Sequence, residues 1–301
     1  MPTILVNEIN KRFGEQIAVD HVSFDVEPGE IFGLLGPNGA GKTTTLRIIL
    51  DIFKPDSGTV EILNGGMTEE KKNRIGYIPE ERGLYQDIQL DRCLVYLATL
   101  KGLATQDANQ KVSAWLERFD LIDHRKNKVK ELSKGMQQKA QLISALVHEP
   151  EVIIIDEPFS ALDPVNTQMV KDLLLEERDH GKTIVMCTHQ MHHAEELCDR
   201  LVLINHGKVV LYGNLTAIQE RYTGKDVIVH ALADFPPTLP GVVSVKQENS
   251  STRLHLDDQL SPQELLRYLV LHDIPIDKFE LALPTLDEIF IQIVTVEEDR
   301  P

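Results

Sequence analysis

The chain has 301 residues, of which 42% are hydrophobic and 26% are charged, a composition typical of a folded protein with a sizeable core. Its 47 acidic and 31 basic residues give a formal net charge of −16, which disfavours loose binding to nucleic acid or to anionic lipid. Apolar runs of only a few residues exclude a membrane-spanning helix. Cys93, Cys187 and Cys198 lack CxxC spacing and predict packed thiols, and the start of the chain does not resemble a secretion signal, so we expect a cytoplasmic protein.

Residues 3–35 predict strands joined by turns, because apolar and polar residues alternate in "TILVNEI" and "VSFDV" and are interrupted at Gly14 and "EPGE". The continuous apolar run "IFGLL" then predicts a strand that is buried on both faces. After a glycine-rich segment, "KTTTLRIILDIF" has helical spacing. The predicted order is therefore strand, loop, helix.

The glycine-rich segment satisfies G-x-x-x-x-G-K-[ST] through Gly36, Gly41, Lys42 and Thr43. In this context successive backbone N–H groups form a concave site for anions, and the helix N-terminus adds partial positive charge. Lys42 would reach the β- and γ-phosphates of a nucleotide, and Thr43 would hold Mg²⁺. The alternative is a glycine-rich turn without a ligand. The segment predicts a nucleoside triphosphate site built from Gly36, Pro37, Asn38, Gly39, Ala40, Gly41, Lys42, Thr43 and Thr44.

From about residue 89 to 150 the spacing is helical, and Val112, Trp115, Leu116 and Phe119 share one face. The apolar strand in "EVIIIDEP", a helix over "PVNTQMVKDLLLEERDHG" and the strand "KTIVMCTH" follow. Helices that alternate with apolar strands predict an α/β fold with a parallel, helix-covered sheet and an inserted helical block. The composition loosens near residues 223–225, and the remainder predicts a small α+β unit with a helix capped by Ser261.

Asp156 ends a buried strand, where α/β sheets bind ligands. Asp156 could hold Mg²⁺ through water, and Glu157 beside it could polarise an attacking water. An Asp-Glu pair at a strand end is also common in a solvated turn. The phosphate loop favours the catalytic interpretation.

The motifs "GPNGAGKTT", "LSKGMQQKAQ", "IDEPFSALDP" and "CTHQ" occur in the order of an ATP-binding cassette (ABC) ATPase, which residues 1–222 resemble. The resemblance implies a RecA-like core, an N-terminal antiparallel β subdomain, a helical subdomain at about 87–150 and a C-terminal domain at 223–301. "IGYIPEERGLY" and "LPTLDEIFIQIV" look more narrowly like the NatA and DrrA type of export ATPases. Their cassettes carry a similar C-terminal extension.

By this resemblance "ELSKGMQQKA" is the signature loop, in which Ser133 and Gly135 would contact the γ-phosphate of ATP held by a second subunit. Each site would then be made by two chains. The motif departs from the common LSGGQ form at Lys134 and Met136. Lys134 could add a cation near phosphate or be an ordinary solvated lysine.

Glu80 matches the position where the family has a metal-binding glutamine, and a glutamate offers oxygen ligands equally well. Phe13 matches an aromatic residue that stacks on adenine, with a core phenylalanine as the alternative. His189 matches the switch histidine, which would touch the γ-phosphate and position Glu157. His189 and His193 also have helical zinc spacing, but Gln190 stands where a zinc protease needs glutamate, so we expect His192 and His193 at a helix surface.

The resemblance implies an ATP-hydrolysing transporter subunit, with ATP and Mg²⁺ as cofactors, whose dimer closure drives separate membrane permease subunits. A second ATPase subunit, no nucleic acid, a peripheral position on the cytoplasmic face of the membrane and export of ions, drugs or other small molecules are implied with it. The helical block around residues 86–102 would grip the permease. Alternatives are a non-membrane ABC ATPase of translation or DNA repair, and a nucleotide-gated regulator. The C-terminal unit would stabilise the dimer or sense a small ligand.

Overall fold

The computed structural model describes residues 1–81, 83–160, 162–231, 239–248, 251–257 and 259–298. The chain divides into two compact units, Met1–Asn214 and Leu215–Pro301, which are described separately below. The functional domains 1–222 and 223–301 stay a prediction. Two motif residues, Arg82 and Ala161, lie outside the described residues.

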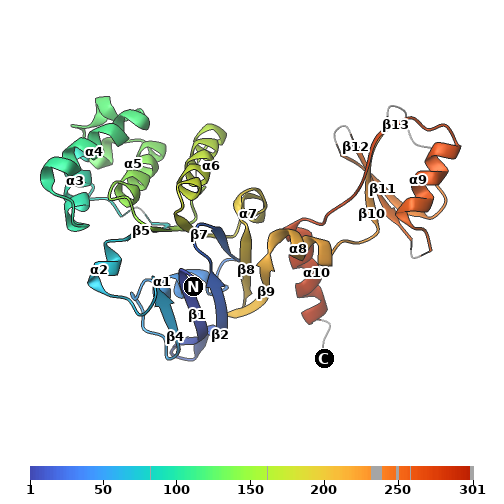
Figure 1. The fold of residues 1–301 in the computed structure, drawn as a ribbon, viewed down its shortest axis with the longest axis horizontal. Coiled ribbons are helices and arrows are strands. Elements are labelled where there is room, and N and C mark those ends of the chain that lie inside the picture. Colours follow the sequence, from blue (N-terminus) through green and yellow to red (C-terminus); the bar gives the residue numbers. More distant parts are fainter. Residues whose placement is uncertain (82, 161, 232–238, 249–250, 258, 299–301) are drawn as a thin grey trace. The chain divides into compact units, whose positions relative to one another are not determined.

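The first unit begins with an antiparallel sheet in the order β2-β1-β4 (Figure 1). Its strands are β1 (Ile4–Phe13), β2 (Gln16–Val26) and β4 (Ser57–Ile62). The break between β1 and β2 includes Gly14, which has a φ of 62°, a conformation that glycine adopts at low cost. This sheet confirms the strands predicted in residues 3–35.

The central sheet has the order β5-β6-β7-β3-β8-β9, parallel from β5 to β8, with β9 antiparallel at its edge. Its strands are β3 (Ile31–Leu35), β5 (Ile75–Ile78), β6 (Val152–Asp156), β7 (Thr183–Thr188), β8 (Arg200–Asn205) and β9 (Lys208–Asn214). Parallel strands end at one edge of a sheet, so the segments after β3, β6 and β7 come together there.

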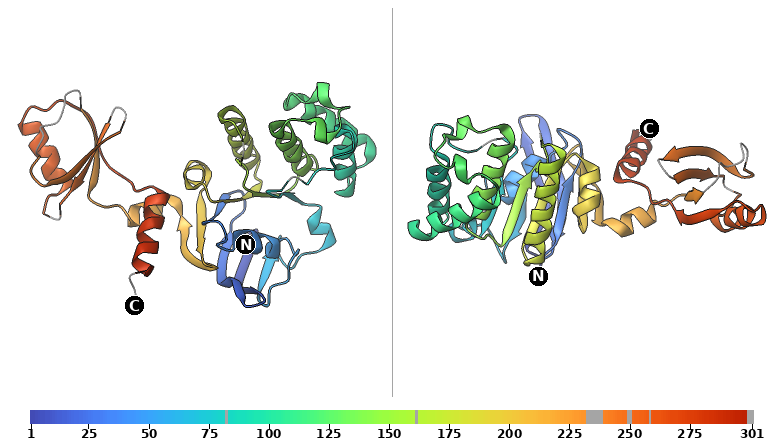
Figure 2. Two further views of the ribbon diagram at one scale, coloured as in Figure 1. Left: turned by 180° about the vertical axis from the view of Figure 1, so that it is seen from behind. Right: turned by 90° about the horizontal axis from the view of Figure 1, so that it is seen from above.

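Helix α1 packs between the two sheets, where Leu46 and Ile49 join a core with Ile4 and Phe32 (Figure 1). The segment between β5 and β6 carries α3, α4 and α5, the predicted helical insert, which forms a separate lobe beside α6 (Figure 2). Short 3-10 helices cover Ile122–His124 and Val129–Glu131. The helices are α1 (Lys42–Ile49), α2 (Glu69–Lys72), α3 (Leu90–Leu100), α4 (Thr105–Arg118), α5 (Lys134–Leu146), α6 (Pro164–Asp179) and α7 (Met191–Leu197).

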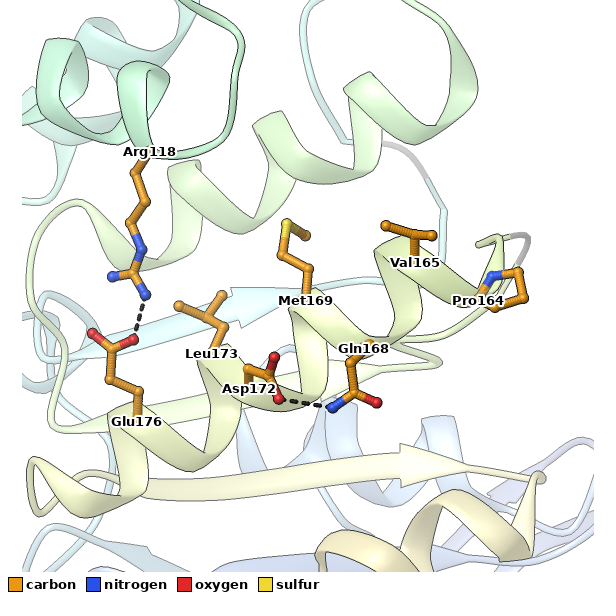
Figure 3. A pocket seen from close by; sticks show the side chains of 8 residues that line it. All are labelled: Arg118, Pro164, Val165, Gln168, Met169, Asp172, Leu173 and Glu176. Carbon is orange, nitrogen blue, oxygen red and sulfur yellow. Dashed lines mark hydrogen bonds and ion pairs between the residues drawn. The ribbon is translucent and has the colours of Figure 1, made fainter.

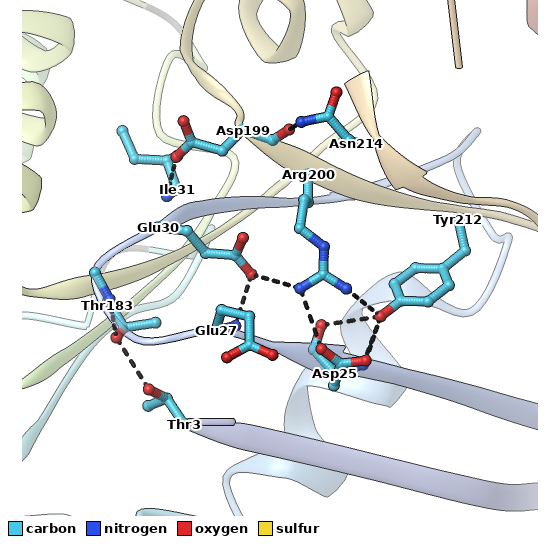
Figure 4. Close-up of polar contacts among 11 residues, drawn as sticks. Thr3, Asp25, Glu27, Glu30, Ile31, Thr183, Asp199, Arg200, Tyr212 and Asn214 are labelled. Carbon is cyan, nitrogen blue, oxygen red and sulfur yellow. Dashed lines mark hydrogen bonds and ion pairs between the residues drawn. The ribbon is translucent and has the colours of Figure 1, made fainter. Parts of the chain in front are cut away.

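A partly buried polar network ties the N-terminal sheet to the central sheet (Figure 4). Arg200 on β8 donates from Nη1 to Asp25 Oδ2 at 3.1 Å and to Glu30 Oε1 at 3.3 Å. The Tyr212 hydroxyl on β9 donates to Asp25 Oδ1 at 2.5 Å. Burial raises the pKa of Glu30, although Arg200 opposes this effect. One guanidinium therefore compensates two carboxylates, one on β2 and one in the loop that precedes β3.

The second unit contains an antiparallel sheet in the order β11-β12-β10-β13. Leu265 and Leu269 of α9 pack with Val227 and Leu254 of the sheet. Ser261 accepts a hydrogen bond from Glu264 N and caps α9, as predicted. The elements are α8 (Leu215–Arg221), β10 (Asp226–Ala231), β11 (Val242–Glu248), β12 (Ser251–Leu256), α9 (Pro262–Leu271), β13 (Ile276–Leu281) and α10 (Leu286–Glu298).

The three cysteines are buried free thiols, as predicted. Within the described part of the chain, every helix is too short or too polar to cross a bilayer.

Candidate functional site

The loop between β3 and α1 has a shape that only glycine permits at two positions. Gly36 has a φ of 146°, and a Cβ atom there would lie 2.1 Å from Ile204 O. Gly41 has a φ of 107°, and its Cβ atom would lie 2.2 Å from Ala18 O. The loop backbone therefore packs directly on two neighbouring backbones. These contacts explain the glycines at both ends of the motif.

The first turn of α1 is suited to an anion. Gly41 is its N-cap, and among the described residues no side chain caps this end and no acidic residue lies in the first turn. The free N–H groups and the helix dipole both favour negative charge. The buried Lys42 Nζ donates to Gly36 O at 2.8 Å and to Pro37 O at 3.1 Å. An ammonium group thus lies directly beside the loop backbone.

The loop opens onto a cavity of about 500 Å³. Ten of the predicted site residues line it: Phe13, Asn38, Gly39, Gly41, Lys42, Thr43, Thr44, Glu80, Asp156 and Glu157. Gly36, Pro37 and Ala40 belong to the loop but are not among the lining residues. Gln16 and Ala18 also line the cavity, and sequence reasoning missed them. They lie in the same β1–β2 hairpin as Phe13. The expected position of Phe13 at the nucleotide was the signal that could have indicated them.

Phe13 is 47% exposed, so the alternative of a core phenylalanine was wrong. Its ring packs against Phe53 with centroids 5.6 Å apart, and Lys11 Nζ lies 5.7 Å from the ring centroid. An exposed aromatic ring at the cavity is available for stacking.

Oxygen ligands suitable for a hard divalent cation converge at the cavity. Thr43 Oγ1 donates to Asp156 Oδ2 at 3.2 Å, which joins the phosphate loop to the end of β6. Asp156 is 2% exposed, and the buried thiol of Cys187 lies against its carboxyl group. Among the described residues, Oδ1 has no nitrogen or oxygen partner within hydrogen-bonding distance. Burial raises the pKa of Asp156. A buried carboxylate oxygen beside the Thr43 hydroxyl, with Glu80 lining the same cavity, fits Mg²⁺, which prefers oxygen ligands.

Glu157 is held in a strained position after β6. Its φ is 52°, in the left-handed region that costs a non-glycine residue about 1–2 kcal/mol. Its Oε2 atom accepts a hydrogen bond from Thr188 Oγ1 at 3.0 Å, and its Oε1 atom accepts one from His189 N at 3.0 Å. The end of β7 thus fixes the carboxylate at the rim of the cavity.

His193 is buried, so the prediction that it lies at the helix surface was wrong. Its ring centroid lies 4.2 Å from that of Phe159. Burial lowers the pKa of His193 to about 4, so the ring is neutral near pH 7. His192 is exposed, as predicted.

Ser133 and Gly135 do not line the cavity that holds the other predicted residues. Ser133 is exposed and caps α5, where its Oγ accepts a hydrogen bond from Met136 N at 3.3 Å. Lys134 is exposed next to it. The signature segment therefore presents a helix N-terminus to the surface.

A second cavity, of about 610 Å³, lies between α6 and the end of α4 (Figure 3). Arg118 of α4 forms an ion pair with Glu176 of α6 at one end. Val165, Met169 and Leu173 make the lining largely apolar. Its described lining residues include no glycine-rich turn, unlike the cavity at the loop before α1.

Known proteins resemble both parts of the chain. A family model described as ABC transporter matches residues 19–160, and one described as the C-terminal domain of DrrA1-3-like ATP-binding proteins matches residues 213–294. The ABC transporter ATP-binding protein YhaQ of Bacillus subtilis is 40% identical over 97% of this chain and 98% of its own. Nod factor export ATP-binding protein I of Burkholderia lata is 38% identical over 73% of each chain. A solved ATP-binding subunit of an ABC transporter is 30% identical with a TM-score of 0.69, covering 73% of this chain and 93% of its own.

Proposed function

Because the chain belongs to the ATP-binding proteins of ABC transporters, we propose that its cavity binds and hydrolyses MgATP to drive export through separate membrane subunits. The observation that carries this proposal is the hydrogen bond of Thr43 to Asp156 at the mouth of the phosphate loop. It joins two groups whose combined chemistry suits a nucleotide with its cation.

The phosphate loop would hold the triphosphate. The N–H groups from Asn38 to Thr44, apart from that of Ala40, which donates to Pro37 O, offer donors. Lys42 would leave the loop carbonyls for the β- and γ-phosphates. Phe13 would stack on the adenine, supported by its exposure at the cavity. Together these contacts bind both ends of ATP.

Thr43, Asp156 and Glu80 would hold the cation. When bound, Mg²⁺ neutralises phosphate charge and helps to align the reacting groups. The Oδ1 atom of Asp156, which has no nitrogen or oxygen partner among the described residues, supports this assignment. Glu80 would take the place of the glutamine usual in the family.

Glu157 would act as the general base and take a proton from the attacking water on a carboxylate oxygen. His189 would position that carboxylate and touch the γ-phosphate. The hydrogen bond from His189 N to Glu157 supports the positioning role.

A second copy of the chain would complete each site. Ser133 and Gly135 are not among the residues that line the cavity of their own chain, which supports action on ATP held by the partner. The C-terminal unit would stabilise this dimer, since it exposes Val270, Leu271 and Ile291. A chain ending at Asn214 should then dimerise more weakly in sedimentation experiments. Unchanged dimerisation would favour a sensing role for this unit.

The permease would dock on α3 and the adjoining loop, at the cytoplasmic face of the membrane. This region exposes Tyr85, Ile88, Tyr96 and Leu100, and a cavity of about 380 Å³ lies beside Lys101. Exposed apolar side chains favour a protein partner over nucleic acid. The name of the Burkholderia relative supports export.

The nucleotide assignment is tested by replacing Lys42 with Ala. MgATP affinity should fall about tenfold or more, measured by fluorescent-nucleotide titration, with a parallel loss of turnover. Lys54→Ala is the matched control, because Lys54 is exposed and pairs with Asp51. Undiminished affinity in the Lys42 variant would contradict the proposal. Purification from membranes with permease subunits would separate transport from the soluble alternatives.

A further inference from the structure

The first turn of α5 is hydrogen-bonded to the residues that precede it. Gln137 is buried, and its Nε2 atom donates to Val129 O and to Leu132 O, each at 3.1 Å. Leu132 immediately precedes Ser133. These hydrogen bonds join the start of α5 to the residues that lead into Ser133.

One helical turn later, Gln141 is hydrogen-bonded to the segment that contains Glu80. Gln141 is 3% exposed, and its Nε2 atom donates to Pro79 O at 2.9 Å and to Glu81 O at 3.3 Å. The two acceptors belong to the residues on either side of Glu80. Since an amide NH₂ group has two hydrogens, one side chain satisfies both carbonyls.

The C-terminal end of α5 and the turn after it also contact β5. A Cβ atom on Gly76 would lie 2.3 Å from Ala145 O, so the two backbones are in direct contact. His148 Nε2 donates to Ile75 O at 3.2 Å. Gln137, Gln141 and Ala145 are spaced four apart, so they lie on one face of α5, and His148 follows two residues after the helix ends. This face therefore joins the signature segment, the Glu80 segment and β5.

We propose that Gln141 is a positioning residue that fixes Glu80 for the metal and makes the Glu80 segment move with α5. The inference rests on the proposed role of Glu80 as a metal ligand. A contact at Ser133 on the partner's nucleotide would thereby reach the metal site of its own chain through one helix. The two sites of the dimer are then coupled mechanically at Gln141.

The test measures metal binding directly. Mn²⁺ is titrated into the full chain with bound ADP, and free Mn²⁺ is followed by electron paramagnetic resonance. Gln141→Met keeps the length of the side chain but removes both donors, and should weaken Mn²⁺ binding about tenfold. Glu80→Ala should do the same, and the double variant should be no weaker than either. Gln110→Met, on the exposed face of α4, is the matched control and should bind Mn²⁺ normally.

ADP affinity in EDTA should remain unchanged in the Gln141 variant, since a general loosening of the cavity would lower it. If Gln141→Met binds Mn²⁺ normally while Glu80→Ala binds it more weakly, the role of Gln141 is overturned but the metal role of Glu80 is not. Normal binding in Glu80→Ala would overturn the metal role of Glu80 as well. Additive losses of Mn²⁺ affinity in the double variant would also overturn the inference, because they would show that Gln141 does not act through Glu80. If Gln141→Met does not fold, Gln141→Asn, whose shorter amide reaches less far, carries the same test.

Discussion

The Nδ1 atom of His189 lies 2.6 Å from Oε1 of Glu157, and the N–H group of His189 donates to the same oxygen. One residue at the end of β7 thus fixes the carboxylate at the end of β6 through two contacts. This arrangement can orient a base without a further residue from another element.

Glu157→Gln should lower ATP turnover by about 10²–10⁴-fold, because an amide cannot accept the proton of the attacking water. MgATP affinity should be retained, since the shape of the side chain is preserved and the amide oxygen can still accept from His189 N. Phosphate release and nucleotide titration measure the two effects. Glu117→Gln, an exposed position on α4, should leave both unchanged. Normal turnover in the Glu157 variant would rule it out as the base.

Gly41→Ala should abolish nucleotide binding, because the added methyl group would lie 2.2 Å from Ala18 O and displace the loop. Gly181→Ala separates this clash from backbone strain. Gly181 also has a positive φ, of 84°, but a Cβ atom there meets nothing within 4 Å. The control should cost about 1 kcal/mol of stability and leave affinity intact. Equal effects of the two changes on nucleotide titration would contradict the argument.

Asp156→Asn should raise the melting temperature at neutral pH while weakening metal binding. Because burial raises the pKa of Asp156 above 3.8, the ionised carboxylate destabilises the fold at neutral pH. This cost is absent below pH 3.8 and appears as the pH rises through the pKa of the folded state. The gain in melting temperature should therefore shrink between pH 7 and pH 4. A gain that grows on acidification would show the opposite shift.

Arg200→Met should lower the free energy of unfolding by about 2 kcal/mol, since Asp25 and Glu30 would lose a charged hydrogen-bond donor. Arg178→Met is the control, because Arg178 pairs with the exposed Asp179 and such pairs contribute about 0–1 kcal/mol. Urea unfolding of both variants gives the comparison. Similar losses would show that the network in Figure 4 adds no specific stability.

The conformation of the loop between β3 and α1 was predictable because its signal is local. Strand, glycines and helix follow one another, and Gly36 and Gly41 have backbone conformations that the motif itself specifies. The capping of α9 by Ser261 was predictable for the same reason. Such features depend on a few neighbouring residues.

Other features depend on tertiary packing and left no signal of this kind. Gln16 and Ala18 reach the cavity only because the hairpin folds against the loop. Gln141 resembles an ordinary polar helix residue, and its burial is explained only by the carbonyls of Pro79 and Glu81. His193 is buried because α7 turns it toward Phe159.

The ammonium of Lys42 rests on the carbonyls of Gly36 and Pro37, the same segment that would surround a phosphate. The strand-to-helix turn is therefore preorganised, because the loop carbonyls hold the Lys42 ammonium group in place when no nucleotide is bound. Nucleotide capture then requires one side chain to exchange acceptors, with little ordering of the chain to oppose affinity. We expect ATP to associate rapidly with each subunit. The slower step should be the closure of the two subunits on each other.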